Sequence, residues 1–283
     1  MPEKRYTVAA CNYNMAETLE ESLKSILNQL DESFEVLVID DGSTDGSQEI
    51  LDRLENEYEI FRWIEGDNEN IGEARAQANQ EAKGEYILPQ LDMDDKYHPV
   101  IEDFIQIFEK LNNIIDKEFY LAGGGLNIGP KTLLTDINYR SLGYGEDKDF
   151  WRRLLSNNSM IILDIHNAYD SIGYNYSRLD RLRISYEVTK NNFKSGVTFS
   201  SFVNWKIKNL NHVDDYFKLI ISPLAFLRAI QEGKYTQPEG YENMGRLFKD
   251  LNEEKFTVSE LEEKYNFEIK EKLSEEGKEI LYL

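Results

Sequence analysis

The first 115 residues alternate between short apolar segments and amphipathic segments, and this alternation is the strongest constraint on the fold. Residues 6–10 and 34–39 are apolar and rich in β-branched side chains, which is typical of buried strands. Between them, apolar residues recur at helical spacing from Leu19 to Leu30. A chain that repeats strand and helix in this way forms a mainly parallel central sheet with helices on both faces. We therefore predict a fold of the α/β class.

The predicted elements can be placed along the whole chain. Strands are expected at residues 6–10, 34–39, 60–64, 85–91, 118–122 and 160–165, and helices at 16–29, around 50–54, 74–82, 98–111, 130–137 and 147–155. Gly84 is expected to be the glycine that ends the third helix. From residue 171 onward the pattern is mostly helical, so we divide the chain into a domain at 1–170 and a helical region at 171–283.

Three polar clusters follow three of the predicted strands. They are Asn12-Tyr13-Asn14, Asp40-Asp41-Gly42-Ser43 and Asp92-Met93-Asp94-Asp95. Ligands of such sheets bind outside the carboxyl ends of the strands, so we expect the clusters to meet at one edge. Each cluster alone is also consistent with an ordinary loop, because Asn, Asp and Gly are common turn formers. Their recurrence at successive strand ends favours a binding site.

The third cluster places three carboxylates within four residues. Like charges this close destabilise one another unless a cation neutralises them. Hard divalent ions take carboxylate oxygens, and Mg²⁺ commonly adds the phosphates of a substrate. We therefore expect Asp92, Asp94 and Asp95 to bind a divalent cation, Mn²⁺ or Mg²⁺, that bridges the protein to a diphosphate. A solvated acidic turn is the alternative.

Composition limits the compartment and the partners. Asp and Glu number 53 against 32 Lys and Arg, and the resulting net charge of -21 disfavours binding to nucleic acid and adhesion to anionic lipid. The single cysteine, Cys11, excludes an internal disulfide framework. No signal peptide is visible in the first ten residues, and the apolar run at 219–227 is too short to cross a bilayer. We expect a cytoplasmic protein without a transmembrane segment, and peripheral contact with the cytoplasmic face of a membrane stays open.

Six motifs together resemble glycosyltransferase family 2, whose members have the GT-A fold. The resemblance covers about residues 5–165, and the motifs follow the family's order and spacing. They are Asn12-Tyr13-Asn14, Val38-Ile39-Asp40-Asp41-Gly42-Ser43-Thr44-Asp45-Gly46-Ser47, Asn70-Ile71-Gly72-Glu73-Ala74-Arg75, Ala82-Lys83-Gly84-Glu85-Tyr86-Ile87, Asp92-Met93-Asp94-Asp95 and Gly145-Glu146-Asp147-Lys148-Asp149-Phe150-Trp151. The resemblance implies metal-dependent transfer of a sugar, with inversion, from a nucleotide diphosphate donor.

The resemblance also implies where the nucleotide binds. Asp41 occupies the family's base-recognition position, and Cys11 and Asn14 lie at the nucleotide-binding end of the first strand. Arg75 matches the basic residue that follows the family's Asn-x-Gly loop. Asp94 joins this group as a ribose contact.

The remaining acidic residues are implied to act on the diphosphate and on the acceptor. Asp94 and Asp95 match the family's acidic pair, with Asp92 as the alternative metal ligand. Asp147, paired in the motif with Glu146, matches the residue that acts as the general base. Inverting transfer is a single displacement, so a base must take the proton of the acceptor hydroxyl.

The sequence departs from the family pattern at three places. Cys11 stands where Pro or Thr is common. Ala74-Arg75-Ala76-Gln77-Ala78 replaces the usual Ala-Arg-Asn-x-Gly, and Met93 replaces a small residue between acidic positions. These departures bear on donor specificity more than on catalysis, because none replaces a carboxylate.

We therefore expect an enzyme that moves a sugar, from a UDP-sugar donor, to a glycan or a lipid-linked saccharide. Residues 171–283 are expected to cover the acceptor side. Arg178, Arg181 and Arg183 form a basic cluster that we expect to contact a phosphate of the donor or of a lipid-phosphate acceptor, with pairing to carboxylates as the alternative.

Two other functions remain as alternatives. A sugar-phosphate nucleotidylyltransferase would need a glycine-rich basic loop after the first strand, and Asn12-Tyr13-Asn14 provides none. A non-catalytic module that binds a nucleotide or a partner would not need Asp147.

Overall fold

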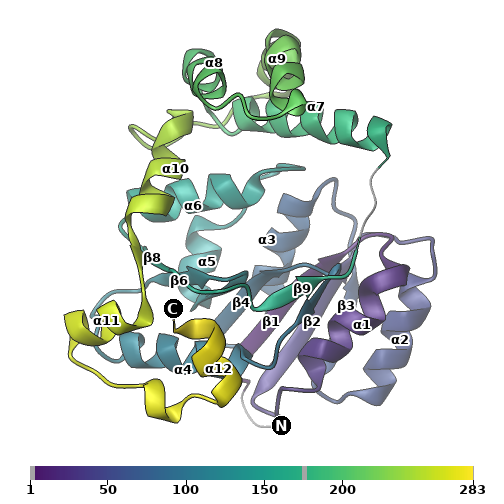
Figure 1. Cartoon of the computed structure of the whole chain (residues 1–283). Coiled ribbons are helices and arrows are strands. Elements are labelled where there is room, and N and C mark those ends of the chain that lie inside the picture. The colour runs from purple at the N-terminus through teal and green to yellow at the C-terminus, as the bar shows by residue number, and fades with distance from the viewer. Residues whose placement is uncertain (1–3, 174–176, 283) are drawn as a thin grey trace.

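An eight-stranded sheet forms the centre of the structure, a computed structural model that describes residues 4–173 and 177–282 (Figure 1). The strand order is β10-β8-β6-β7-β4-β1-β2-β3, and β5 pairs separately with β9. The strands are β1 (Tyr6–Asn12), β2 (Phe34–Asp40), β3 (Phe61–Glu65), β4 (Tyr86–Leu91), β5 (Asp95–Tyr97), β6 (Tyr120–Gly123), β7 (Leu126–Pro130), β8 (Met160–Leu163), β9 (Tyr169–Ser171) and β10 (Lys255–Phe256). The helices are α1 (Ala16–Leu27), α2 (Ser47–Glu57), α3 (Ile71–Glu81), α4 (Ile101–Asn112), α5 (Lys131–Ile137), α6 (Glu146–Ser156), α7 (Arg178–Lys194), α8 (Phe199–Lys208), α9 (Val213–Glu232), α10 (Met244–Glu253), α11 (Val258–Tyr265) and α12 (Glu275–Leu281).

The sheet is mainly parallel, so the predicted fold class is confirmed. β1 pairs in parallel with β2 and β4, and β6 pairs in parallel with β8. β7 runs antiparallel to β4 and to β6, and the sequence analysis did not predict it. Gly124 and Gly125 form the turn before β7 with φ angles of 57° and 86°. The glycine run therefore permits a tight hairpin, which requires left-handed backbone.

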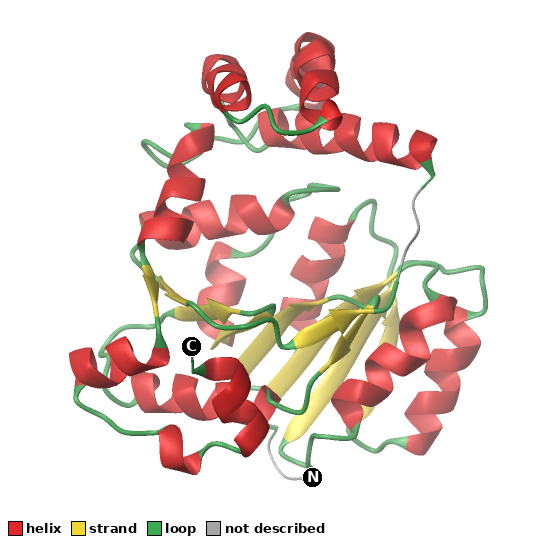
Figure 2. Cartoon of the chain, in the orientation of Figure 1, coloured by secondary structure: helices red, strands yellow, loops and turns green. Residues whose placement is uncertain are grey.

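Helices cover both faces of the sheet and enclose two apolar cores (Figure 2). Alternate residues of one strand face different cores: Val36 and Val38 join the core that includes α1, α2 and α4, whereas Leu37 and Ile39 join the core that includes α3, α5 and α6. This alternation follows from the two-residue period of a strand. A strand buried on both faces is mostly apolar, as β2 is from Val36 to Ile39, and its one interior charge, Glu35, is paired with Arg62 at 2.6 Å.

The chain after β9 does not form one helical block. Helices α7, α8 and α9, which we call the α7–α9 layer, lie beyond the carboxyl edge of the sheet, and α10 leads back to it (Figure 1). β10 then pairs in parallel with β8 at the end of the sheet, and α12 packs against α4. In the described part of the chain, no helix is long and apolar enough to cross a membrane.

Asp149 in α6 connects the sheet-bound helices to the α7–α9 layer. Its carboxylate is fully buried and accepts hydrogen bonds from Arg140 and from Gln237 Nε2, the latter at 2.5 Å. Gln237 Nε2 also donates to the backbone carbonyl of Ser195 at the end of α7. Arg153 pairs with Asp149 at 2.9 Å. Asp149 is thus enclosed by partners from distant segments of the chain.

Two motif glycines allow close backbone approach. Gly84 does not end α3, which stops at Glu81; a Cβ at Gly84 would lie 2.6 Å from the backbone nitrogen of Thr7. The predicted helix-ending role of Gly84 was therefore wrong. Gly72 lies in the first turn of α3, where a Cβ would lie 2.1 Å from the carbonyl oxygen of Arg140. Gly72 thus lets α3 approach the loop that leads to α6.

We predict that Gly72→Ala destabilises the fold by about 1–3 kcal/mol, because the atom in its way is backbone and cannot move alone. Chemical denaturation measures the change. Gly143→Ala is the matched control, since the nearest atom to its Cβ would lie 3.8 Å away. Equal stability of the two variants would contradict the close packing of α3 against this loop.

Candidate active site

The loops after β1 and β2 are held together by one buried aspartate. Asp40 is fully buried, and it accepts hydrogen bonds from Asn12 Nδ2 at 2.5 Å and from the hydroxyl of Ser43 at 2.6 Å. Gln48 Nε2 donates to its second oxygen at 3.0 Å. Asp40 therefore organises the loop and is not available to a ligand.

Asp41, the predicted base-recognition residue, has a different environment. Its Oδ1 accepts from the side-chain nitrogen of Asn68 at 2.7 Å, and both described bonds use this one oxygen. Burial raises the pKa of Asp41, with further repulsion from Asp40 and Glu73. The side chain lies where β2 and β3 end, because a Cβ at Gly66 would lie 2.3 Å from its Oδ1.

Cys11 and Asn14 lie at the end of β1, as the sequence predicts. Burial raises the pKa of the Cys11 thiol to about 12, so the thiol stays neutral near pH 7. Asn14 has a left-handed backbone with φ of 54°, and its side-chain oxygen accepts from the backbone nitrogen of Thr44 at 2.8 Å. Asn14 thus joins the loops after β1 and β2.

Arg75, in the third motif, connects the fifth and sixth motifs. This α3 side chain is buried, and its guanidinium pairs with Glu146 at 2.7 Å and with Asp92 at 3.0 Å. One buried cation therefore neutralises acidic residues from the end of β4 and from the start of α6. Sequence spacing could not predict this junction, because the three residues lie on separate elements.

The two predicted catalytic residues at the start of α6 differ in their surroundings. Glu146 is buried, and burial raises its pKa while Arg75 opposes the rise. Asp147 is half-buried and lines the cleft described below. In the described ranges, no residue forms a hydrogen bond or ion pair with the Asp147 side chain. Glu146 thus anchors the helix start, whereas the Asp147 carboxylate faces the cleft.

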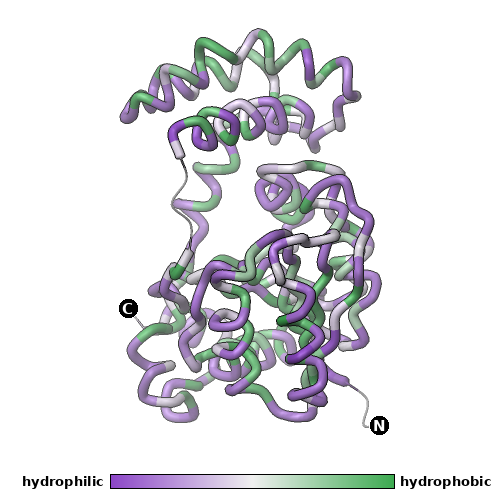
Figure 3. The backbone as a smooth tube through the Cα atoms, turned by 90° about the vertical axis from the view of Figure 1, so that its right-hand side faces the viewer, coloured by the Kyte–Doolittle hydropathy of each residue, from purple (hydrophilic) through white to green (hydrophobic). Residues whose placement is uncertain are grey.

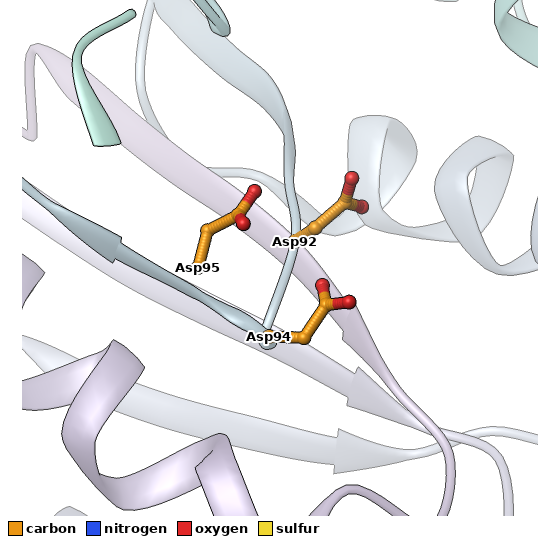
Figure 4. A group of neighbouring side chains, drawn as sticks. All are labelled: Asp92, Asp94 and Asp95. Carbon is orange, nitrogen blue, oxygen red and sulfur yellow. The ribbon is translucent and has the colours of Figure 1, made fainter. Parts of the chain in front are cut away.

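The three aspartates of the acidic cluster converge, as predicted (Figure 4). Each of Asp92, Asp94 and Asp95 offers one carboxylate oxygen, and these oxygens lie within 4.8 Å of one another. Asp95 is only 8% exposed, whereas the Asp92 side chain is 54% exposed. Burial and repulsion from Asp94 and Asp92 raise the pKa of Asp95 to about 7. An all-oxygen set whose mutual repulsion is only partly relieved, by Arg75 at Asp92, fits a hard divalent cation.

A cleft of about 700 Å³ lies beside this cluster. Its floor is formed by the carboxyl edge of the sheet, and its far wall is formed by α7 and α10. Among the predicted site residues, those that line it are Arg75, Asp92, Asp95, Glu146 and Asp147. Asp94 does not line it, although its carboxylate lies beside those of Asp92 and Asp95. Cys11, Asn14 and Asp41 do not line it either; they lie along the same sheet edge toward β3. Arg178, Arg181 and Arg183 are exposed on α7, and none of them lines the cleft.

Gln90 lines the cleft with φ of 67° and was not predicted as a site residue. Its side-chain oxygen accepts from Tyr120 and Asn127, both at 3.2 Å. A non-glycine residue in this region is strained, and such strain is common at functional sites. The pairing of β1 with β4 shifts register between Leu88 and Leu91, the stretch that contains Gln90. Pro89 was the available signal, because a proline within a central strand usually marks a bulge.

Other proteins share this fold and these motifs. The sequence profile described as glycosyl transferase family 2 matches residues 7–194. Cholesterol galactosyltransferase of Borreliella burgdorferi is 31% identical over 153 residues, which is 53% of this chain and 41% of that protein. Chondroitin synthase of Escherichia coli is 34% identical over 125 residues, covering 41% of this chain and 18% of that protein. The chain thus spans less than half the length of these relatives.

Two solved structures have a similar fold. TarS 1-349 of S. aureus in complex with UDP-GlcNAc has a TM-score of 0.54 at 18% identity, covering 80% of this chain and 81% of that chain. Glucosyl-3-phosphoglycerate synthase of Mycobacterium tuberculosis has a TM-score of 0.53 at 15% identity, covering 68% of this chain and 80% of that chain. The GT-A fold expected from the motifs is confirmed. Because the family profile matches well over half of its length, the chain belongs to glycosyltransferase family 2.

Proposed function

We propose that this protein is a metal-dependent, inverting glycosyltransferase that moves a sugar from a UDP-sugar to a glycan or a lipid-linked saccharide. One observation carries the proposal. The Asp147 carboxylate, without a partner among the described residues, lines the same cleft as Asp92 and Asp95, and Asp94 completes their acidic cluster. A proton acceptor and a diphosphate-binding site are the two parts that this reaction needs.

The comparisons support the donor class. TarS is described in complex with UDP-GlcNAc, and glucosyl-3-phosphoglycerate synthase is described in complex with Mn²⁺, UDP and its product. A mannosyltransferase of Pyrobaculum calidifontis is described in complex with GDP-Man and Mn²⁺. These descriptions favour a nucleotide-sugar donor and a divalent cation, and two of the three favour uridine.

The cation would be held by Asp92, Asp94 and Asp95, where it supplies a Lewis acid that stabilises the charge on the leaving diphosphate. Arg75 neutralises part of the charge of Asp92, which lowers the repulsion between the cluster and the anionic donor. The negative charge that remains on the cluster attracts the cation. We propose Mn²⁺ or Mg²⁺ as the ion.

Asp147 would act on the acceptor. Its carboxylate accepts the proton of the acceptor hydroxyl while that oxygen bonds to the anomeric carbon and the bond from that carbon to the diphosphate oxygen breaks. One displacement inverts the anomeric configuration. The ion pair between Glu146 and Arg75 fixes the start of α6, and it thereby positions the neighbouring Asp147.

The nucleotide would extend from the cleft along the sheet edge. The second oxygen of Asp41 has room for a base N–H, because both bonds from Asn68 use Oδ1. Cys11 and Asn14 would flank the base and ribose, and Asp94 would contact the ribose. We propose a cytoplasmic protein in which residues 1–170 perform catalysis and residues 171–283 cover the acceptor side.

Asp147→Asn is expected to lower turnover by about 10²- to 10⁴-fold, because the amide cannot accept the proton. Donor affinity is expected to stay near wild type. UDP release from a panel of UDP-sugars measures turnover, and calorimetry measures affinity. Asp136→Asn, at an exposed carboxylate on α5, is the control and should leave both unchanged. Wild-type turnover in Asp147→Asn would remove Asp147 as the base and favour a non-catalytic binding role for this residue.

Thermal unfolding in the presence of UDP-, GDP- and dTDP-sugars tests the donor and the cation together. We expect a UDP-sugar to raise the unfolding temperature only when Mn²⁺ is present, with about 2.7 kcal/mol of stabilisation at a ligand concentration one hundred times Kd. Asp94→Asn should lose the part that depends on Mn²⁺, and Asp136→Asn should keep it. Stabilisation by none of the nucleotides would overturn the proposed donor class.

The pKa of Asp95 predicts a pH dependence for the metal-free protein. Because the folded-state pKa of about 7 lies above the unfolded value near 3.8, the folded protein holds this proton more tightly, and its stability falls as pH rises from about 4 to 7. Asp95→Asn removes this loss. We expect the variant to be more stable than wild type at pH 8, by roughly 4 kcal/mol at most, and the difference to vanish near pH 4.

Urea denaturation of the metal-free protein across this pH range is the measurement. Added Mn²⁺ should stabilise wild type more at pH 8 than at pH 5, and should have little effect on Asp95→Asn. A pH-independent difference between the two proteins would show that Asp95 is not a strained carboxylate.

A further inference from the structure

Helix α9 exposes a continuous apolar stripe. Its members recur every three or four residues, so they share one face of the helix. The stripe consists of Val213, Tyr216, Ile220, Leu224 and Leu227, with exposed fractions of 83%, 56%, 77%, 63% and 59%. The opposite face is already used, because Ala225 and Ala229 are buried against Phe193 of α7. Packing within this chain therefore does not account for the stripe.

The stripe lies on the outside of the molecule. In Figure 1, α8 and α9 are the helices farthest from the sheet, and the uppermost helices in Figure 3 carry hydrophobic stretches along their length. Other exposed apolar side chains belong to the same layer, namely Leu179 and Leu182 on α7 and Ile207 on α8. Exposed apolar patches of this kind mark interaction surfaces.

Charge divides the chain between this layer and the remainder. Residues 178–234 contain ten Lys and Arg against five Asp and Glu, whereas the rest of the chain contains 22 against 48. The layer is therefore net positive on a protein of net charge -21. Arg178, Arg181 and Arg183 form its densest exposed cluster, and among the described residues none of the three has an ion pair. The whole-chain charge concealed this division.

We propose that the α7–α9 layer docks on an anionic lipid bilayer. The α9 stripe enters the boundary between headgroups and acyl chains, and the three arginines bind lipid phosphates. An amphipathic helix lying in this boundary gains affinity from buried apolar area and from attraction to anionic lipid. The arginines, which do not line the cleft, thus acquire a phosphate ligand outside it.

A second copy of the chain fits this surface less well. Pairing two stripes would bring together two layers of net positive charge. Pairing the layer with the acidic remainder of another copy would satisfy the charge but would place the stripe on a charged surface. An anionic bilayer satisfies both requirements. The inference goes beyond sugar transfer and does not depend on the donor.

Co-sedimentation of the full chain with vesicles tests the proposal. One vesicle contains equal parts of phosphatidylglycerol and phosphatidylcholine, and the other contains phosphatidylcholine alone. We expect binding to the anionic vesicles, weakened by salt because the arginines act through charge. Absence of binding to anionic vesicles at low salt would overturn the proposal.

Matched variants separate the two contributions. The double variant Ile220→Asp with Leu224→Asp should lower vesicle binding at least about tenfold, whereas Ile114→Asp, at an exposed apolar residue outside the layer, should not. Replacing Arg178, Arg181 and Arg183 by Gln should also weaken binding. The same charge change at Lys83, Lys96 and Lys249, which are exposed outside the layer, should have little effect.

Two further measurements keep the result unambiguous. The unfolding temperature and its response to UDP-sugar with Mn²⁺ should be the same in the stripe variant as in wild type. If wild type itself shows no such response, the proposed donor is wrong, and the vesicle result still stands on its own. Sedimentation velocity reports the oligomeric state. Wild-type vesicle binding by the stripe variant would overturn the proposal, as would conversion of a wild-type dimer to a monomer by that variant.

Discussion

Repulsion among carboxylates gathered at one end of the sheet is the constraint on which the site depends. Parallel strands deliver the ends of β1, β2 and β4 to the same edge, and this chain places acidic residues after two of them. The fold tolerates the resulting charge by pairing part of it internally: Arg75 neutralises Glu146 and Asp92. Within residues 4–173 and 177–282, Asp94, Asp95 and Asp147 have no such cation, and this remaining charge is what the proposed metal ion and acceptor proton would neutralise.

The α/β class, the order of most elements and the acidic cluster could be predicted from the sequence, because each is encoded locally. A strand buried on both faces is mostly apolar and the turn at its end is polar, so β2 and the loop after it are recognisable from a few residues, even though β2 contains the buried Glu35. β7 could not be recognised in the same way. Its five residues contain Gly129 and Pro130, which are poor strand formers, and its position is set by β4 and β6 on either side.

The electrostatic roles could not be predicted, because they depend on partners far away in the sequence. Asp40 and Asp41 are neighbours with the same chemistry, yet one is enclosed by Asn12 and Ser43 and the other is half-exposed at the edge. In sequence, Asp149 cannot be told apart from the other acidic residues at the start of α6. In the structure it accepts a hydrogen bond from Gln237, which lies 88 residues later in the chain. The roles of Cys11, Asn14 and Asp41 in nucleotide binding remain predictions.

The α7–α9 layer follows β9 in the chain, and the chain returns from it to the sheet through α10 and β10. Both ends of the layer are therefore connected to the sheet. A segment tethered in this way contributes no strand to the sheet. Its sequence can diverge, or be exchanged for another helical segment, without altering strand order or the acidic cluster. The helices that face the cleft can therefore change during evolution while the residues at the sheet edge stay the same.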